Sequence, residues 1–241
     1  MQVLITENYD ELSEVAASII IEEMQKKKDI VLGLATGSTP IGTYQNLVAA
    51  SKNNIISFAD AICYNLDEYL GLNKDHEQSY HYFMNDNLFN HVDIKPDNIN
   101  IPAGDLVDAN EAVNDYIKKL ALKERDIQIL GIGENGHIGF NEPGTSFASQ
   151  THITELSLET RESNKRFFNN LDEVPKYAIT MGISEIMAAK KILLLISGKN
   201  KAKTVKELLE GYRSEAFPAS VLLDHDNITL VVDKEAMSLV E

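Results

Sequence analysis

The stretch Ile30-Val-Leu-Gly-Leu-Ala-Thr-Gly-Ser-Thr-Pro40 shows the unit from which the fold is built. The run from Ile30 to Ala35 has the length and apolar composition of a buried strand. A glycine and two hydroxyl residues follow, and Pro40 suits the first turn of a helix that the residues up to Lys52 can form. The stretch therefore predicts a β-strand, a tight loop and an α-helix in direct succession.

The same succession recurs along the whole chain. Short apolar runs lie at residues 2–5, 30–35, 61–66, 98–102, 127–133, 177–183, 191–197 and 227–232. Segments with helical periodicity lie between them, at residues 10–28, 40–52, 79–91, 108–124 and 200–210. Such alternation is typical of βαβ units, in which helices cover both faces of a mostly parallel sheet. The sequence predicts a Rossmann-like α/β fold, and a length of 241 residues fits a single domain over 1–241.

The composition limits the cellular compartments in which the protein is expected and the classes of partner that it can bind. The chain has 22 basic and 37 acidic residues, a net charge of −15, which disfavours nucleic acid and anionic membranes as partners. One cysteine, Cys63, cannot form an internal disulfide, and the first residues lack the pattern of a secretion signal. No apolar run approaches the roughly 20 residues that span a bilayer. We therefore expect a cytoplasmic protein.

In a parallel sheet, ligands bind beyond the carboxyl ends of the strands, so the loops at residues 36–40, 65–69, 131–144 and 197–201 are the candidates for a site. In the first, Thr36, Gly37, Ser38 and Thr39 offer hydroxyls and amides to a phosphate, but a plain helix cap explains them equally well. The loop lacks the Gly-Lys-Ser/Thr ending of a Walker A motif. In the second, Asp67 fits either a catalytic base or a capping residue, and its own residue type favours the cap.

The most specific motif is Gly131-Ile-Gly-Glu-Asn-Gly-His-Ile-Gly-Phe-Asn-Glu-Pro-Gly144. It starts like a dinucleotide fingerprint but runs into His137 and Pro143 instead of a long helix. Its glycines allow the backbone to approach a ligand closely, and His137 with the nearby Glu142 forms a candidate proton-transfer pair. We expect no metal site, because the histidines of the segment at 76–81 are five residues apart and would diverge on a helix.

Five blocks, NLDEY, GIGENGHIGFNEPG, SNKRFF, VPKYAITMGI and SGKNKAKTVKELLEG, together resemble the glucosamine-6-phosphate deaminase family over residues 30–235. The resemblance implies conversion of glucosamine 6-phosphate and water into fructose 6-phosphate and ammonia, with no metal or other cofactor. It also implies a segment at 151–177 that closes over the site. The partner is then a small-molecule substrate, and we expect a monomer or a low-order homo-oligomer.

The resemblance further implies a role for each matching residue. Asp67 matches the base that moves the C2 proton, and His137 matches the acid/base that opens the sugar ring. Asn135 and Glu142 match the residues that support the histidine. Arg166 and Lys201 match the cations that bind phosphate, together with the loop from Thr36 to Thr39.

One position departs from the pattern of many members, which carry aspartate where this chain has Asn135. An amide orients its neighbours through hydrogen bonds without adding charge, so the electrostatic tuning of His137 is expected to differ. Two alternatives share the fold: a 6-phosphogluconolactonase-like enzyme, and a non-catalytic sugar-phosphate sensor. The joint presence of Asp67, His137 and Glu142 argues against the sensor.

Overall fold

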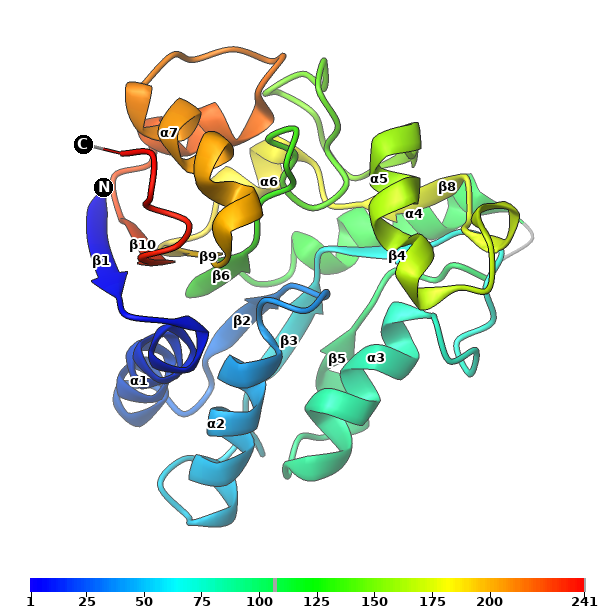
Figure 1. Ribbon diagram of the computed structural model, residues 1–241. Coiled ribbons are helices and arrows are strands. Elements are labelled where there is room, and N and C mark those ends of the chain that lie inside the picture. The colour runs from blue at the N-terminus through cyan, green and yellow to red at the C-terminus, as the bar shows by residue number, and fades with distance from the viewer. Residues whose placement is uncertain (106–107, 241) are drawn as a thin grey trace.

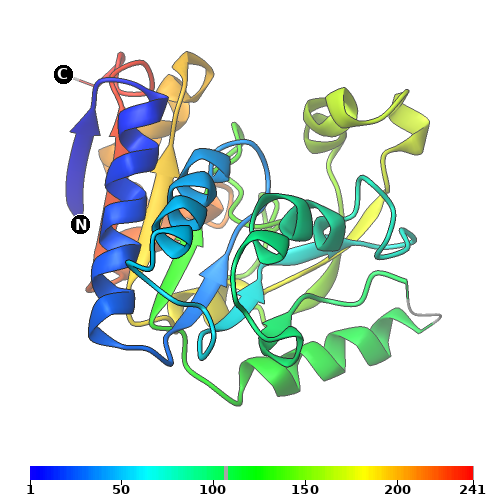
Figure 2. The same ribbon diagram turned by 90° about the horizontal axis from the view of Figure 1, so that it is seen from below.

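The computed structural model describes residues 1–105 and 108–240 and shows a parallel sheet with helices on both faces (Figures 1 and 2). Seven strands pair in the order β1-β10-β9-β6-β2-β3-β5, and every neighbouring pair is parallel. The strands are β1 (Gln2–Thr6), β2 (Val31–Leu34), β3 (Ile62–Asn65), β5 (Ile99–Asn100), β6 (Ile127–Leu130), β9 (Ile192–Ile196) and β10 (Ile228–Asp233). The α/β fold expected from the alternating pattern is confirmed.

Helices cover the sheet on both sides, as the right-handed βαβ rule requires. Helices α1 (Tyr9–Lys26), α2 (Ile41–Lys52) and α3 (Tyr80–Asn87) lie side by side over one face (Figure 2). The other face carries α4 (Ala109–Leu120), α6 (Ile183–Met187) and α7 (Ala202–Glu210). Because helices cover both faces, the strands β2, β6, β9 and β10 are buried along their whole length. Within the described ranges, no helix is long and apolar enough to cross a membrane.

One expected strand joins a different sheet. The run at residues 177–183 forms β8 (Tyr177–Thr180), which pairs antiparallel with β4 (Asp67–Tyr69) and β7 (His152–Glu155). The run is a strand, as expected, but it is not part of the parallel sheet. Ala178 of β8 belongs to a second, smaller hydrophobic core that includes Phe140 and Leu156. An apolar run shows that a strand is buried but not which strand pairs with it.

Residues 151–177 supply β7 of this small sheet and the chain that joins it to β8. They contain β7, helix α5 (Leu158–Asn164) and the short 3-10 helices η3 (Lys165–Phe167) and η4 (Leu171–Glu173). The remaining 3-10 helices are η1 (Phe89–His91), η2 (Pro96–Asn98), η5 (Lys199–Lys201) and η6 (Pro218–Asp224).

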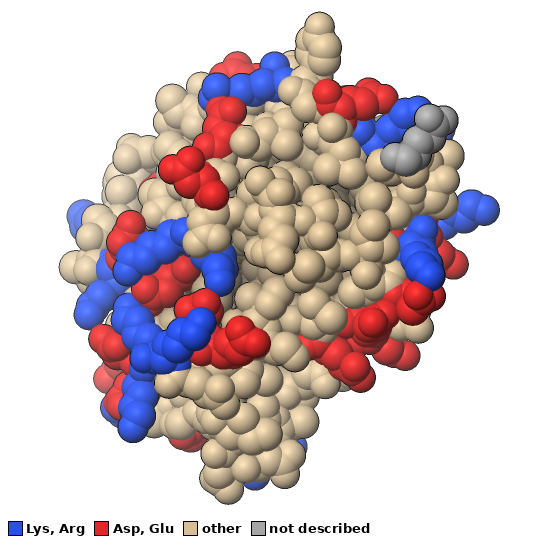
Figure 3. Space-filling model, turned by 90° about the vertical axis from the view of Figure 1, so that its left-hand side faces the viewer, with Lys and Arg blue, Asp and Glu red and all other residues tan. Residues whose placement is uncertain are grey.

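The surface mixes charges of both signs. On the side where β1 and the chain ends lie, basic side chains gather among acidic ones, and much of the face is uncharged (Figure 3). Ion pairs such as Lys191–Glu23 at 2.9 Å and Lys190–Asp126 at 3.0 Å locally neutralise the lysines.

The chain passes from the small sheet to the main body at Gly182, where its backbone packs closely against the preceding loop. Gly182 lies between β8 and α6, and a Cβ atom there would come within 2.3 Å of the backbone of Ser149 and Gln150. The neighbouring amide of Ser184 donates to the carbonyl of Ser149 at 3.0 Å, so this approach is fixed by hydrogen bonding.

We therefore expect Gly182→Ala to destabilise the protein by about 1–3 kcal/mol, because backbone atoms cannot yield as a flexible side chain does. Gly131→Ala is the matched control, since a Cβ there meets nothing within 4 Å. Thermal unfolding of both variants checks this expectation. Equal melting temperatures for the two variants would show that the close approach at Gly182 is not a constraint.

Candidate active site

The loops predicted to carry a site meet at one edge of the sheet. They follow β9, β6, β2 and β3, which are four consecutive neighbours in the sheet order. From β2 the chain continues outward to β3 and β5, whereas from β6 it continues in the opposite direction to β9 and β10. Such a switch in direction opens a crevice between the two loops that flank it. A cavity of about 320 Å³ lies there.

One end of the cavity is suited to an anion. Its lining includes the whole predicted phosphate set: Thr36, Gly37, Ser38, Thr39, Arg166 and Lys201. The Arg166 guanidinium comes from η3 and donates to the Ser38 hydroxyl at 3.3 Å. The Lys201 ammonium comes from η5, and its pKa is lowered by burial, while Glu134 raises it and the charge of Arg166 lowers it further. A bound anion would relieve the repulsion between these two cations.

Asp67 lies in the wall of the same cavity. It is the first residue of β4, one residue beyond the end of β3, so the chain carries it directly out of the main sheet. Only 5% of its surface is exposed, and burial, together with the neighbouring charge of Glu68, raises its pKa to about 8. Around neutral pH, Asp67 is therefore mostly protonated.

His137 also lines the cavity, and Gly133 makes room for its ring. A Cβ at Gly133 would lie 2.3 Å from Cε1 of the imidazole, so any larger residue would displace the ring. Burial lowers the pKa of His137 to about 4, although Glu142 acts in the opposite direction, and Lys201 lowers it further. The imidazole is neutral at neutral pH and is able to accept a proton.

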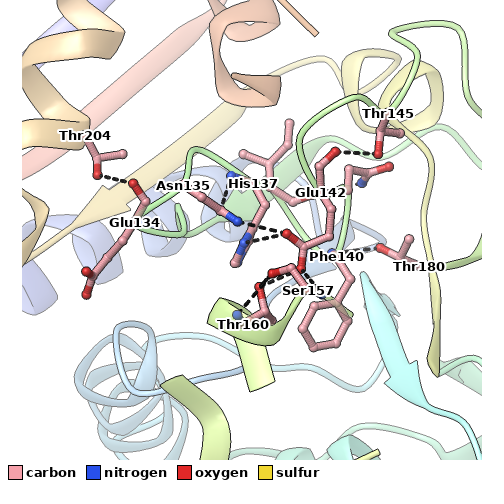
Figure 4. Close-up of polar contacts among 12 residues, drawn as sticks. Glu134, Asn135, His137, Phe140, Glu142, Thr145, Ser157, Thr160, Thr180 and Thr204 are labelled. Atoms are coloured by element: carbon pink, nitrogen blue, oxygen red, sulfur yellow. Dashed lines mark hydrogen bonds and ion pairs between the residues drawn. The ribbon is translucent and has the colours of Figure 1, made fainter. Parts of the chain in front are cut away.

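Asn135 and Glu142 lie behind the histidine and do not line the cavity. The Asn135 amide donates to Glu142 Oε2 at 2.9 Å, and its own Oδ1 accepts from the backbone N–H of His137 at 3.2 Å (Figure 4). Glu142 Oε2 lies 3.8 Å from His137 Nδ1, beyond hydrogen-bond distance. Glu142 thus faces the ring as a nearby charge, and Asn135 holds the carboxylate and the loop backbone rather than the imidazole.

The other oxygen of Glu142 is bound by the segment at 151–177. Thr160 Oγ1 donates to Glu142 Oε1 at 2.5 Å, and the backbone N–H of Ser157 donates to the same oxygen at 3.2 Å (Figure 4). The segment that supplies Arg166 to the cavity wall therefore also holds the carboxylate behind His137.

Comparison with known proteins gives the family. A family model described as "Glucosamine-6-phosphate isomerases/6-phosphogluconolactonase" matches residues 6–231. The chain belongs to this family. Within it, the chain is 50% identical over 241 residues to a protein of Thermoanaerobacter sp. (strain X514) named glucosamine-6-phosphate deaminase, covering 100% of this chain and 95% of that one. It is also 50% identical over 240 residues to glucosamine-6-phosphate deaminase 1 of Bacillus subtilis (strain 168), covering 99% of each.

Solved structures of family members also resemble this chain in fold. A glucosamine-6-phosphate deaminase described as monomeric superposes with a TM-score of 0.97 at 50% identity, covering 99% of this chain and 100% of that chain. A 6-phosphogluconolactonase from Thermotoga maritima superposes with a TM-score of 0.77 at 22% identity, covering 97% of this chain and 99% of that chain. At that identity the likeness extends to the fold alone.

Sequence reasoning missed part of the cavity lining. The additional side chains include Tyr80, Glu134, Phe140, Thr160, Asn164, Ser197 and Asn200. Ser197 and Asn200 belong to the loop at 197–201, so proximity to Lys201 was the available signal. Tyr80 and Asn164 reach the cavity from α3 and α5, and no pattern in the sequence indicates that. Among the described residues, no three His, Cys, Asp or Glu side chains come together in a way that could hold a metal ion.

The raised pKa of Asp67 has a consequence for stability. Folding raises the pKa from the ordinary value of 3.8 to about 8, so the folded protein keeps a proton that the unfolded chain loses. The associated stability is complete below the unfolded pKa and is lost as pH rises through the folded pKa.

We therefore expect Asp67→Asn to be more stable than the native protein, by a margin that grows by about 1–3 kcal/mol between pH 6 and pH 9. The matched control is Asp75→Asn, which changes an exposed aspartate and should show a constant difference. Chemical unfolding at several pH values measures the margin. A margin independent of pH would contradict the burial of an ionisable Asp67 in the folded state.

Proposed function

We propose that this chain converts glucosamine 6-phosphate and water into fructose 6-phosphate and ammonia, without a metal or other cofactor. The observation that carries the proposal is that Asp67, His137 and a pair of cations line one cavity. Family members with the corresponding names, 50% identical over almost their full length, support it. The reaction of a sugar phosphate needs an anion site and two proton-transfer groups, and residues of both kinds line this cavity.

The phosphate is bound by charge and by hydroxyl groups. Lys201 and Arg166 neutralise it, and the loop from Thr36 to Thr39 supplies hydrogen-bond donors. Binding at this end leaves the sugar carbons to extend towards Asp67 and His137.

Ring opening is assigned to His137. A neutral imidazole takes the proton from the hydroxyl on C1 as the bond between C1 and the ring oxygen breaks, and it returns a proton to that oxygen. The pKa of about 4 keeps the imidazole in the required neutral form. The charge of Glu142 stabilises the imidazolium that forms between the two transfers.

The isomerisation is assigned to Asp67. In the open chain, the hydrogen on C2 lies next to an aldehyde, so a carboxylate can remove it to give an enolamine and return it at C1. The C2 iminium that results adds water and releases ammonia, with no net oxidation of the molecule. The carboxylate must be ionised to act, and the ammonium group that the substrate carries on C2 favours that form.

Three further inferences concern the segment at 151–177, the oligomeric state and the cellular compartment. We infer that residues 151–177 close over the bound sugar as a lid on the single domain, which the contacts of Thr160 with Glu142 and of Arg166 with Ser38 support. We further infer a monomer or low-order homo-oligomer, as the solved relative described as monomeric suggests. A charged sugar phosphate does not cross membranes, so we infer that the enzyme acts in the cytoplasm.

An ammonia-release assay tests the reaction and the phosphate site together. Glucosamine 6-phosphate should be turned over, and glucosamine without phosphate should be a very poor substrate. Lys201→Ala should lose catalytic efficiency by a factor of roughly 10–150, equivalent to about 1.5–3 kcal/mol, because a charge-assisted bond is lost. Lys203→Ala, an exposed lysine of the next helix, is the control and should be unaffected. Equal turnover of glucosamine and its phosphate would reject the phosphate site.

Hydrogen exchange at C2 separates the two proton-transfer groups. Asp67→Asn should abolish exchange of the C2 hydrogen with solvent together with deamination, since it preserves the shape but removes the base. His137→Gln should slow the reaction of the closed ring much more than exchange on an open-chain analogue. Nuclear magnetic resonance in deuterated water measures both. Exchange at the native rate in Asp67→Asn would show that another residue is the base.

A further inference from the structure

Glu68 is a second buried carboxylate, next to the assigned base in the chain. It is 2% exposed and does not line the cavity, because alternate residues of a strand point in opposite directions. Its oxygens accept three backbone hydrogen bonds. Oε1 accepts from Tyr69 at 2.8 Å and from Tyr80 at 2.9 Å, and Oε2 accepts from His81 at 2.9 Å.

Two of these donors are the first two amides of helix α3. The third amide, that of Tyr82, donates to the hydroxyl of Ser79, which is the N-cap residue. Helix α3 therefore starts against two side chains, of which Ser79 is local and Glu68 comes from β4. A carboxylate at a helix N-terminus satisfies free amides and interacts favourably with the helix dipole.

The first residue of this helix forms part of the cavity wall. The ring of Tyr80 lies 4.7 Å from that of Tyr69 and stacks on Phe140 at 5.9 Å, between centroids. Tyr80 lines the cavity beside Asp67. The position of the Tyr80 ring next to the base thus depends on where α3 begins, and Glu68 fixes that point.

We propose that Glu68 is a positioning residue for the base Asp67, acting by holding Tyr80 in the cavity wall and by carrying a like charge on the adjacent residue of the same strand. The inference rests on the proposed function, in which Asp67 moves the C2 proton. It adds a residue that does not touch the substrate but determines the surroundings and the protonation of the one that does.

The electrostatics agree with this role. Burial raises the pKa of Glu68 to about 7, its three amide donors lower it, and Asp105 raises it from the neighbouring loop. Ionisation of Glu68 in turn raises the pKa of Asp67, so the two carboxyls titrate as a pair.

Apart from Asp105, the titratable groups that face the pair are three tyrosines and one histidine, and they are uncharged near neutral pH. The phenols of Tyr69 and Tyr80, and that of Tyr116 on α4, all have pKa values raised by burial. His81 on α3 has its pKa lowered, chiefly by burial.

The experiment compares Glu68→Gln with Ser79→Ala. Both remove a cap from the first turn of α3, but only the first removes a charge beside Asp67. In the native enzyme, kcat/KM should rise with pH as Asp67 ionises, and this rise forms the acidic limb of the pH profile. In Glu68→Gln this limb should move to lower pH by about half a unit or more, since the like charge is gone. In Ser79→Ala the limb should stay in place. Substrate ionisations are common to all variants and do not affect the comparison.

A third variant, Glu68→Asp, keeps the charge but is one methylene shorter, so it loses reach to α3. We expect its limb to stay at the native pH while kcat falls, because the Tyr80 ring is no longer held. This variant still tests the proposal if Glu68→Gln does not fold.

Failure of the inference and failure of the proposed function are distinguishable. An active native enzyme in which Glu68→Gln and Ser79→Ala have the same pH limb would overturn the inference. A limb displaced in Glu68→Asp as far as in Glu68→Gln would overturn it as well, since charge would then not matter. A native protein that releases no ammonia from glucosamine 6-phosphate would instead reject the proposed function.

Discussion

Parallel pairing of the strands is the constraint on which the site depends. Because β9, β6, β2 and β3 are neighbours and run in the same direction, their carboxyl ends lie together at one edge. Residues separated by more than 160 positions, such as Thr36 and Lys201, thereby line one cavity. The change of chain direction between β2 and β6 opens the space that the glycine-rich loop and the Thr36 loop enclose.

Burial shifts the pKa values of Asp67 and His137, which both lie at this edge of the sheet, in opposite directions. It raises the pKa of Asp67 to about 8 and lowers that of His137 to about 4, because in each case the charged form loses its hydration. At neutral pH both groups are therefore neutral, whereas the free side chains would be a carboxylate and a partly charged imidazole. A cationic, phosphorylated substrate supplies the charges that such a site lacks, which suits acid–base work at neutral pH.

The small antiparallel sheet connects these groups to the segment at 151–177. Its β4 begins with Asp67, and its core places Tyr69 next to Phe168 of that segment, 6.0 Å apart between ring centroids. Asn164 of α5 donates to the Tyr69 hydroxyl at 2.9 Å. The segment therefore contacts the strand that carries Asp67, the carboxylate behind His137 and Ser38 of the loop from Thr36 to Thr39, so its position affects all parts of the cavity at once.

The sequence by itself determined the alternation of strands and helices, and its motifs indicated the residues that now line the cavity, from Thr36 to Lys201. These features are local: apolar periodicity, glycine at a tight loop, and a histidine close to a carboxylate. Tertiary structure decided that residues 177–180 pair with β4 rather than with the main sheet, and that Asn135 holds Glu142 instead of the imidazole. It also brought Tyr80 to the cavity and placed Glu68 at the start of α3. Strand partners and side-chain contacts depend on which distant surfaces pack together, and that information is spread over the whole chain.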